Sequence, residues 1–189
     1  FHQDSLYLYK IDIKKYFPSI SKQKIYNFFY FKMNCSKDVA GILAEVTTYF
    51  GHLPTGSPLS PIMSYHVNSD MWEEIYLRTL ESDCKLSVWV DDICVSGSII
   101  PGSLIWDIKK IIHNHDFEYH KEMTYTSREF KNIPGIITTP KRIMARKGQY
   151  RKLRELRKEI ASTEDLHSSR LLDLKIKGLK SYIEAVEES

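Results

Sequence analysis

The chain has 189 residues, 42% hydrophobic and 27% charged, which is enough for one domain with a substantial core, or one domain and an appendage. Three cysteines show neither metal-ligand nor disulfide spacing, so the composition argues against a disulfide scaffold and for a reducing compartment, which we expect to be cytoplasmic. No apolar run approaches the roughly 18 residues that a membrane span needs, so no membrane partner is expected.

The first half of the chain is predicted to form one strand followed by helices. Residues 6–13 have the β-branched and aromatic composition of a strand. Ser21 can cap a helix over 21–33, and Ser36 can cap a second helix that begins there. Residues 51–61 hold two Gly and three Pro and predict a loop, and a helix is predicted over 59–80. The apolar positions at helical spacing in the second helix are Val39, Ile42, Leu43 and Val46.

The second half begins with strands and ends in helices. The predicted elements, in chain order, are a β-hairpin over 85–98, a helix from 101–103 to about His115, strands over 117–126 and 132–144, and helices over 149–161 and 164–187. Pro134 and Gly135 interrupt the second of these strands. Strands that pair mostly antiparallel, with helices on one face, predict an α+β fold.

Two adjacent acids stand at the tip of the predicted hairpin, in the stretch "SVWVDDICVSG" (87–97). Burying one carboxylate costs several kcal/mol unless something compensates, and two neighbouring carboxylates also repel each other. One sheet can bring Asp12, at the end of the first strand, beside Asp91 and Asp92. Three carboxylates near one point would suit Mg²⁺, which takes oxygen ligands, although an ordinary capped turn and a strand-end cap remain alternatives.

These residues resemble the motifs of a reverse transcriptase palm, and in particular those of the bacterial retron-type enzymes. The stretches that carry the resemblance are "IDIKKYFPSI" (11–20), "LPTGSPLSP" (53–61), "WVDDI" (89–93), "NIPGIIT" (132–138) and "IKGLKSYIEAV" (176–186). The family more often has Tyr or Phe where Trp89 stands and Thr where Pro134 stands. The resemblance implies a polymerase palm over 1–145, with an antiparallel sheet packed on helices, and a partial helical thumb over 146–189.

The resemblance also implies a two-metal site. Asp12, Asp91 and Asp92 are expected to hold two Mg²⁺ ions, or Mn²⁺ in their place, with the Ile13 carbonyl as an additional oxygen. Asp12 and Asp91 are expected to be the direct ligands and Asp92 the more peripheral one. Relatives have a fingers region before the first motif, whereas nothing before residue 6 can supply it here. We therefore expect the fingers to be absent or truncated, and the sequence, which lacks an initial Met, to be part of a longer chain.

The expected nucleotide site follows from the first two motifs. In the family, an aromatic residue at the position of Phe17 lies beneath the incoming sugar and excludes a 2′-hydroxyl by steric clash. Tyr16 could take this role if the alignment shifts by one residue, and Phe17 would then be an ordinary core aromatic. Thr55, Gly56 and Ser57 are expected to pass along the incoming nucleotide. Many relatives carry Gln where Thr55 stands; the alternative for this stretch is a plain helix-entry loop.

The fourth motif departs from the family pattern. In "FEYHKEMT" (117–124), strict alignment places Met123 where relatives have a lysine near the leaving pyrophosphate. Lys121 lies two residues earlier, on the same face of a strand, and is expected to replace that lysine as a catalytic group. An exposed strand lysine is the alternative. His120, at a usual Asn position, is expected to face the opposite side.

Positive charge is concentrated near the C-terminal end. Residues 141–158 hold nine Lys or Arg and one Glu, although the net charge of the whole chain is only +3. Such density is typical of contact with a phosphate backbone, and a solvated helix face is the alternative. In the predicted helix, Leu153, Leu156 and Ile160 form an apolar stripe. The neighbouring stripe, expected to bind nucleic acid, consists of Lys147, Arg151, Arg154 and Lys158.

The expected function is therefore RNA-directed DNA synthesis from dNTPs on a DNA or RNA primer. The retron-type resemblance implies a cognate structured non-coding RNA, a role in phage defence and an effector protein as partner. Two alternatives remain open: a template-independent or protein-primed polymerase of the abortive-infection type, and a non-catalytic RNA-binding module on the same fold.

Overall fold

The structure is a computed structural model that describes residues 1–139, 142–163 and 165–188, and it has an α+β fold with antiparallel sheets packed on helices. It divides into two compact units, Leu6–Thr124 and a unit made of Phe1–Ser5 with Tyr125–Ser189. This division falls earlier in the chain than the predicted boundary at residue 145. The assignment of palm and thumb stays a prediction.

The Leu6–Thr124 unit is built around a sheet with strand order β2-β3-β1-β4. Its elements, in chain order, are β1 (Tyr7–Ile13), α1 (Lys22–Asn27), α2 (Lys37–Thr47), α3 (Ser60–Val67), α4 (Ser69–Glu81), β2 (Lys85–Trp89), β3 (Asp92–Gly97), α5 (Gly102–Asn114) and β4 (Tyr119–Tyr125). β3 pairs antiparallel with both β1 and β2. The predicted first strand, the 85–98 hairpin and the helix after residue 101 are confirmed.

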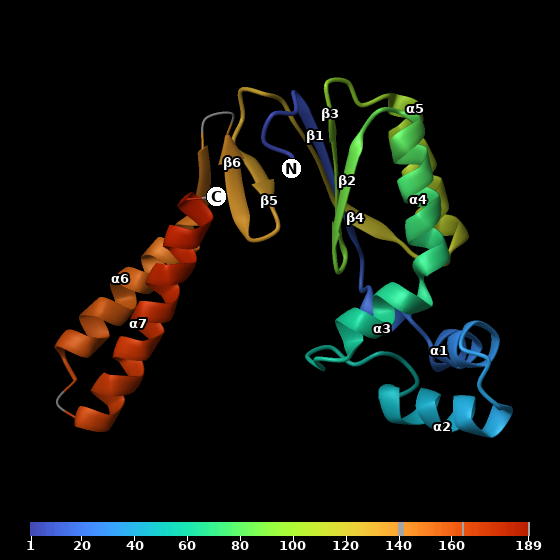
Figure 1. Cartoon of the computed structure of the whole chain (residues 1–189), viewed down its shortest axis with the longest axis horizontal. Helices are drawn as coiled ribbons and strands as arrows, with labels where there is room; N and C mark the ends of the chain where they lie inside the picture. The colour runs from blue at the N-terminus through green and yellow to red at the C-terminus, as the bar shows by residue number, and fades with distance from the viewer. Residues whose placement is uncertain (140–141, 164, 189) are drawn as a thin grey trace. The chain divides into compact units, whose positions relative to one another are not determined.

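One face of this sheet carries the core. Residues such as Ile11 on β1 and Val95 on β3 are fully buried against Ile75 of α4 and Ile108 of α5, because alternate strand residues point to the same side. α4 and α5 run side by side over this face (Figure 1). Lys10, Asp12 and Asp92 occupy the alternate positions and therefore lie on the other face of the sheet.

Three predicted helices differ in detail from those observed. The helix over 21–33 begins at its Ser21 cap as expected, but its last turn, Phe28–Lys32, is π-helical. The helix over 59–80 is two helices, because Asn68 Nδ2 donates to the Ser64 carbonyl at 2.8 Å and the backbone at Asn68 leaves the helical conformation. α2 buries Ala40 and Ala44, while Ile42 is 63% exposed.

The other unit combines a small sheet with a helical hairpin. Its elements are β5 (Lys131–Ile133), β6 (Ile136–Thr139), β7 (Arg142–Ala145), α6 (Lys147–Ala161) and α7 (Leu166–Glu187). The strand predicted over 132–144 is three strands, and the predicted interruption at Pro134-Gly135 is confirmed: this turn, with Gly135 at φ +86°, reverses the chain so that β5 and β6 pair antiparallel. Pro140 and Lys141 of that stretch, and Glu164 of the predicted last helix, lie outside the described residues.

The two helices of this unit confirm their predictions. α6 and α7 lie side by side along their lengths (Figure 1). The predicted apolar stripe of α6 packs against α7, with Leu153 and Leu156 nearly buried and Ile160 at the edge of the cluster. Within the described ranges, no helix is both long and apolar enough to cross a membrane.

Candidate active site

Strand pairing brings two of the predicted carboxylates together. Asp12, the sixth residue of β1, stands directly opposite Asp92, the first residue of β3. The ladder continues past them, since the Ile13 backbone N–H donates to the Asp91 carbonyl at 2.8 Å. Both side chains are largely covered, with 15% of Asp12 and 20% of Asp92 exposed. The sheet therefore places Asp12, Asp91 and Asp92 at one end of two adjacent strands, as the sequence predicted.

The turn that carries Asp91 has an unusual backbone. Trp89 pairs with Asp92, so only Val90 and Asp91 form the loop of the β2–β3 hairpin. Val90 has φ +61°, a left-handed conformation that a β-branched residue rarely adopts. Such a conformation costs on the order of 1–3 kcal/mol and persists where surrounding structure imposes it, often at functional sites. Two-residue hairpin loops usually use Asn-Gly or Asp-Gly instead, which makes this turn a candidate for function.

The three carboxylates differ in their surroundings. Burial raises the pKa of the Asp91 carboxyl above its ordinary value, and the charges of Asp12 and Asp92 raise it further. Asp92 has a basic neighbour, because Lys10 Nζ lies 2.7 Å from its Oδ1 atom. That contact is not aligned as a hydrogen bond, and within the described part of the chain this buried oxygen has no hydrogen-bond partner. Lys10, two residues before Asp12 on the same face of β1, was not among the predicted site residues.

Two consecutive basic residues of β4 approach Asp12. His120 Nε2 contacts Asp12 Oδ1, and Lys121 Nζ lies 3.6 Å from Asp12 Oδ2. The prediction that His120 faces away from the site is therefore wrong. The reason is the backbone of Lys121, whose φ of +51° breaks the alternation of the strand and turns both side chains toward one carboxylate.

The residues at this end of the sheet offer oxygen atoms, the kind of donor that a hard cation binds. Carboxylate oxygens are the ligands that Mg²⁺ prefers, and the Oδ1 of Asp92, which accepts no hydrogen bond among the described residues, is a further acceptor. In the arrangement described, however, basic groups contact Asp12 and Asp92, and no group of three or more His, Cys, Asp or Glu side chains in the described residues is gathered to hold an ion. The type of the donor atoms and their location at one end of the sheet therefore suit Mg²⁺. The carboxylate side chains, however, are not gathered around one point.

The structure separates the two candidate sugar-contacting aromatics. Tyr16 is 3% exposed, and its hydroxyl donates to the Ser64 carbonyl at 2.9 Å. Burial raises the pKa of Tyr16 to about 12. The alternative role of Tyr16 against a nucleotide is therefore wrong, because its ring and hydroxyl are both used in the core. Phe17 is only partly buried, at the start of a 3₁₀ turn, and keeps a free side.

The predicted nucleotide-side loop is accessible. Thr55 and Gly56 are exposed, and Gly56 has φ +91° with nothing near the position where a side chain would begin. The loop is anchored where α3 begins, since Ser60 Oγ donates to the Pro54 carbonyl at 2.7 Å and the Leu59 N–H donates to Ser57 Oγ at 3.3 Å. Glycine is needed at residue 56 for this left-handed backbone.

The predicted basic stripe is exposed on α6. Lys147, Arg151, Arg154 and Lys158 all lie on the solvent side of the helix, opposite the apolar stripe and not beside it as predicted. Three of them, with Gly148 and Tyr150, line a shallow hollow of about 460 Å³. Arg151 approaches Glu155 at 3.8 Å, a contact between exposed groups that is worth little. The stripe therefore remains available to an anionic partner.

Comparison with known proteins supports the fold. No family model matches the chain. Among solved structures, it is similar to apo telomerase from Candida tropicalis, truncated from its C-terminal domain, with a TM-score of 0.51 and 15% identity. The match covers 75% of this chain and 35% of that one, so the chain spans about a third of the telomerase structure's length. At this identity the likeness shows the fold alone.

Proposed function

We propose that the chain is the catalytic palm, with the start of a thumb, of an RNA-directed DNA polymerase. The observation that carries this proposal is the placement of Asp12 opposite Asp92, with Asp91 in a strained turn beside them, on a reverse-transcriptase-like fold. A fold alone does not establish an activity, whereas three carboxylates at one sheet end supply the groups that phosphoryl transfer needs.

The reaction is attack of the primer 3′-oxygen on the α-phosphorus of a dNTP, with formation of a new P–O bond and release of pyrophosphate. Asp12 and Asp91, with the Ile13 carbonyl, would hold Mg²⁺ or Mn²⁺, which when bound supplies positive charge to the reacting oxygens. Asp92, against which Lys10 lies, would take the more peripheral position that the resemblance implies. His120 and Lys121 stand on the same side as Asp12, where the charge of Lys121 can neutralise the triphosphate.

The template and primer would lie over the face of the sheet that carries these carboxylates. Phe17 would contact the sugar of the incoming nucleotide, and Thr55, Gly56 and Ser57 would pass beside it. The basic stripe of α6 would contact the phosphate backbone, which contributes affinity without sequence information. A retron-type enzyme, with a structured non-coding RNA and an effector protein in phage defence, is the finer assignment that the sequence motifs favour.

The proposal is tested by primer extension. The chain is given a primed RNA template, labelled dNTPs and Mg²⁺, and extension to the template length is the expected product. Omitting the template tests the template-independent alternative, and omitting the primer while following label on the protein tests protein priming. Binding of the RNA duplex without any nucleotide incorporation would contradict the proposal and favour a non-catalytic RNA-binding module.

Charge removal on α6 has a predictable effect on nucleic-acid binding. Each phosphate contact contributes roughly 0.7 to 0.9 to the slope of log K against log salt. Replacing Arg151 and Arg154 by Gln is expected to weaken template–primer binding and to reduce this slope by about 1 to 2, nearly independently of template sequence. Fluorescence anisotropy over a salt series measures both quantities.

A matched control comes from α7. Lys175 and Lys180 are exposed and lie outside the basic stripe, so replacing both by Gln removes the same charge from another helix. The control should leave the slope close to that of the parent chain. Equal slopes in parent, stripe variant and control would show that the stripe is a solvated face.

A further inference from the structure

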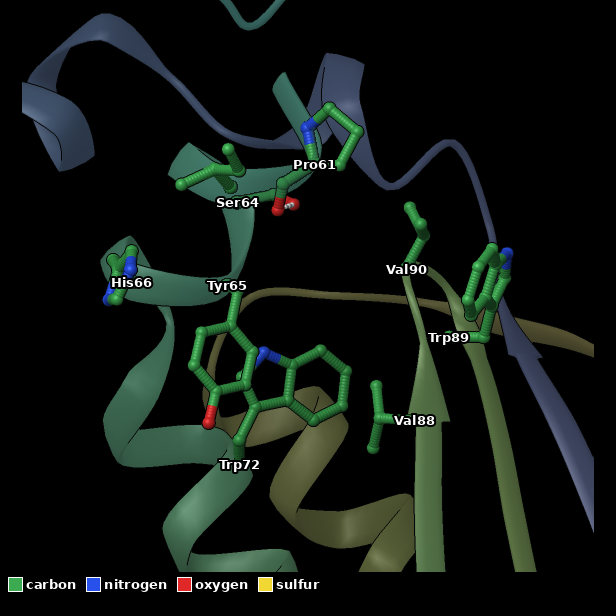
Figure 2. Close-up of a pocket in the computed structure, with 9 residues that line it drawn as sticks. Pro61, Ser64, Tyr65, His66, Trp72, Val88, Trp89 and Val90 are labelled. Atoms are coloured by element: carbon green, nitrogen blue, oxygen red, sulfur yellow. Dashed lines mark hydrogen bonds between the residues drawn. The ribbon is translucent and has the colours of Figure 1, made fainter. Parts of the chain in front are cut away.

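Strand β4 departs from the alternation that a regular strand keeps, in which successive side chains point to opposite faces of the sheet. β2 keeps it: Val88 faces Trp72 of α4, whereas the next residue, Trp89, points away from that helix (Figure 2). In the β4 stretch Tyr119–Glu122, by contrast, the two outer residues share one face and the two inner residues share the other.

The two outer residues of this stretch face α5. The ring centroids of Tyr119 and His113 lie 5.3 Å apart, and Lys109 Nζ lies 5.4 Å from the centroid of the Tyr119 ring. The same Lys109 Nζ lies 2.6 Å from Glu122 Oε2. Lys109 therefore contacts two β4 residues that are three positions apart, which regular alternation would send to opposite faces.

The two inner residues, His120 and Lys121, both approach Asp12 on the carboxylate face of the sheet. Regular alternation would let only one of two consecutive side chains reach that face. The break in alternation is at Lys121, whose φ of +51° is left-handed and unfavourable for a residue other than glycine. Such a conformation persists where surrounding contacts impose it. Contacts with Asp12 on one face and the Lys109–Glu122 pair on the other can both do so.

Contacts with Asp12 cannot maintain this backbone in the proposed function, because Asp12 then binds a cation and does not hold two basic side chains as well. The Lys109–Glu122 pair lies on the other face, and its side chains are only 21% and 39% exposed, so it is partly shielded from solvent. Glu122 also lies near the buried Tyr9 of β1: burial raises the pKa of the Tyr9 hydroxyl, and the Glu122 carboxylate raises it further. The pair is thus part of the packing between β1, β4 and α5.

We propose that Lys109 is a positioning residue of the candidate active site: by holding Glu122 against α5, it maintains the left-handed backbone that directs Lys121 toward Asp12. What Lys121 does for nucleotide addition rests on the proposed function, whereas the dependence of its backbone on Lys109 does not. One measurement of the backbone and one of activity therefore separate the two.

The backbone at residue 121 is measured by NMR on the isotopically labelled chain. The three-bond coupling between the amide and α protons depends on φ and is larger for an extended strand residue than for a left-handed one. Lys109→Met removes the charge and keeps the length of the side chain. The coupling at residue 121 is then expected to rise to the value of an extended residue. Lys109→Arg keeps the charge and should retain the small coupling of the parent.

Lys110→Met is the matched control, because Lys110 is the next residue of α5 but is exposed. Its coupling at residue 121 should equal that of the parent chain. Glu122→Gln is a milder change in the same pair and should also raise the coupling. The result therefore does not depend on Lys109→Met forming a folded chain.

Primer extension tests whether the position of Lys121 matters for the reaction. Lys109→Met is expected to lower kcat/KM for dNTP by up to about 10²-fold, as a misplaced reacting group can. Lys121→Asn tolerates the left-handed backbone but lacks the amine. In that background Lys109→Met should cause no further loss, because Lys109 acts through Lys121. Lys110→Met should extend primers at the parental rate.

Both measurements can overturn the inference. An unchanged coupling at residue 121 in both Lys109→Met and Glu122→Gln contradicts it. Losses of extension that multiply in the double variant also contradict it, because Lys109 would then act independently of Lys121. If the coupling rises as expected but the parent chain extends no primer, the proposed function is wrong and the dependence of the Lys121 backbone on Lys109 stands.

Discussion

Replacing Asp91 by Asn is expected to abolish primer extension while leaving the fold intact. The substitution keeps the size of the side chain, replaces one acceptor oxygen by an amide donor, and removes the charge that would hold a cation beside Asp12. Losing one preorganised charge-stabilising group typically costs on the order of 10²–10³ in rate, and a metal ligand should cost at least that. Single-turnover extension with Mg²⁺ measures the loss.

The same substitution should not destabilise the chain. Burial and two neighbouring acids raise the pKa of Asp91 in the folded state, so ionisation of this carboxyl begins to oppose folding above the lower pKa of the unfolded chain and does so fully above the folded pKa. The neutral Asn removes this unfavourable term. Without divalent cation at neutral pH, the variant is therefore expected to melt at the same temperature as the parent or higher. As the pH falls below the folded pKa the difference should shrink, and it should vanish below the ordinary pKa, where the carboxyl is protonated in the folded and the unfolded chain.

Asp83→Asn provides the control for the loss of one acidic charge. Asp83 is an exposed turn residue just before β2, with φ +51°, and Asn tolerates this left-handed conformation. It should retain normal extension. If the Asp91 variant polymerises near the parental rate, the assignment of the metal site is wrong; if it fails to fold, the carboxylate has a structural role.

The part of the site built on strand pairing could be predicted from the sequence. Alternation of apolar and polar residues in "LYLYKIDI" and in the arms of the 85–98 hairpin determines which side chains share a face. Once β1 and β3 pair, Asp12 must stand near Asp92. The same alternation would have found Lys10, because residues two apart on a strand share a face.

The rest depends on backbone conformations that a sequence pattern does not reveal. His120 joins the site only because Lys121 adopts a positive φ, which interrupts the alternation on which the prediction rested. The break between α3 and α4 depends on the Asn68 side chain, which competes for the Ser64 carbonyl. The spacing of apolar residues in the sequence does not predict this hydrogen bond. In both places a local polar or strained contact overrides a regular pattern.

Replacing Phe17 by Ala is expected to admit ribonucleotides. The structure leaves Phe17 as the aromatic with a free side, since Tyr16 is committed to the core through Ser64 and its neighbouring rings. Removing a ring that blocks a 2′-hydroxyl makes room for one additional chemical group. A pocket that excludes one such group typically discriminates between two substrates by roughly 10–200-fold. The ratio of kcat/KM for rNTP to that for dNTP should rise by this factor.

Two controls separate selectivity from stability. Phe31→Ala removes an aromatic ring that is 68% exposed in the same unit and should leave the nucleotide ratio unchanged. Tyr16→Phe removes the hydroxyl bond to Ser64, which should cost about 1 kcal/mol of stability without altering the ratio. Because Phe17 also packs in part against the core, the melting temperature of its Ala variant should fall modestly. A fall in dNTP incorporation with no gain for rNTP would mean that Phe17 supports the fold but does not contact the sugar.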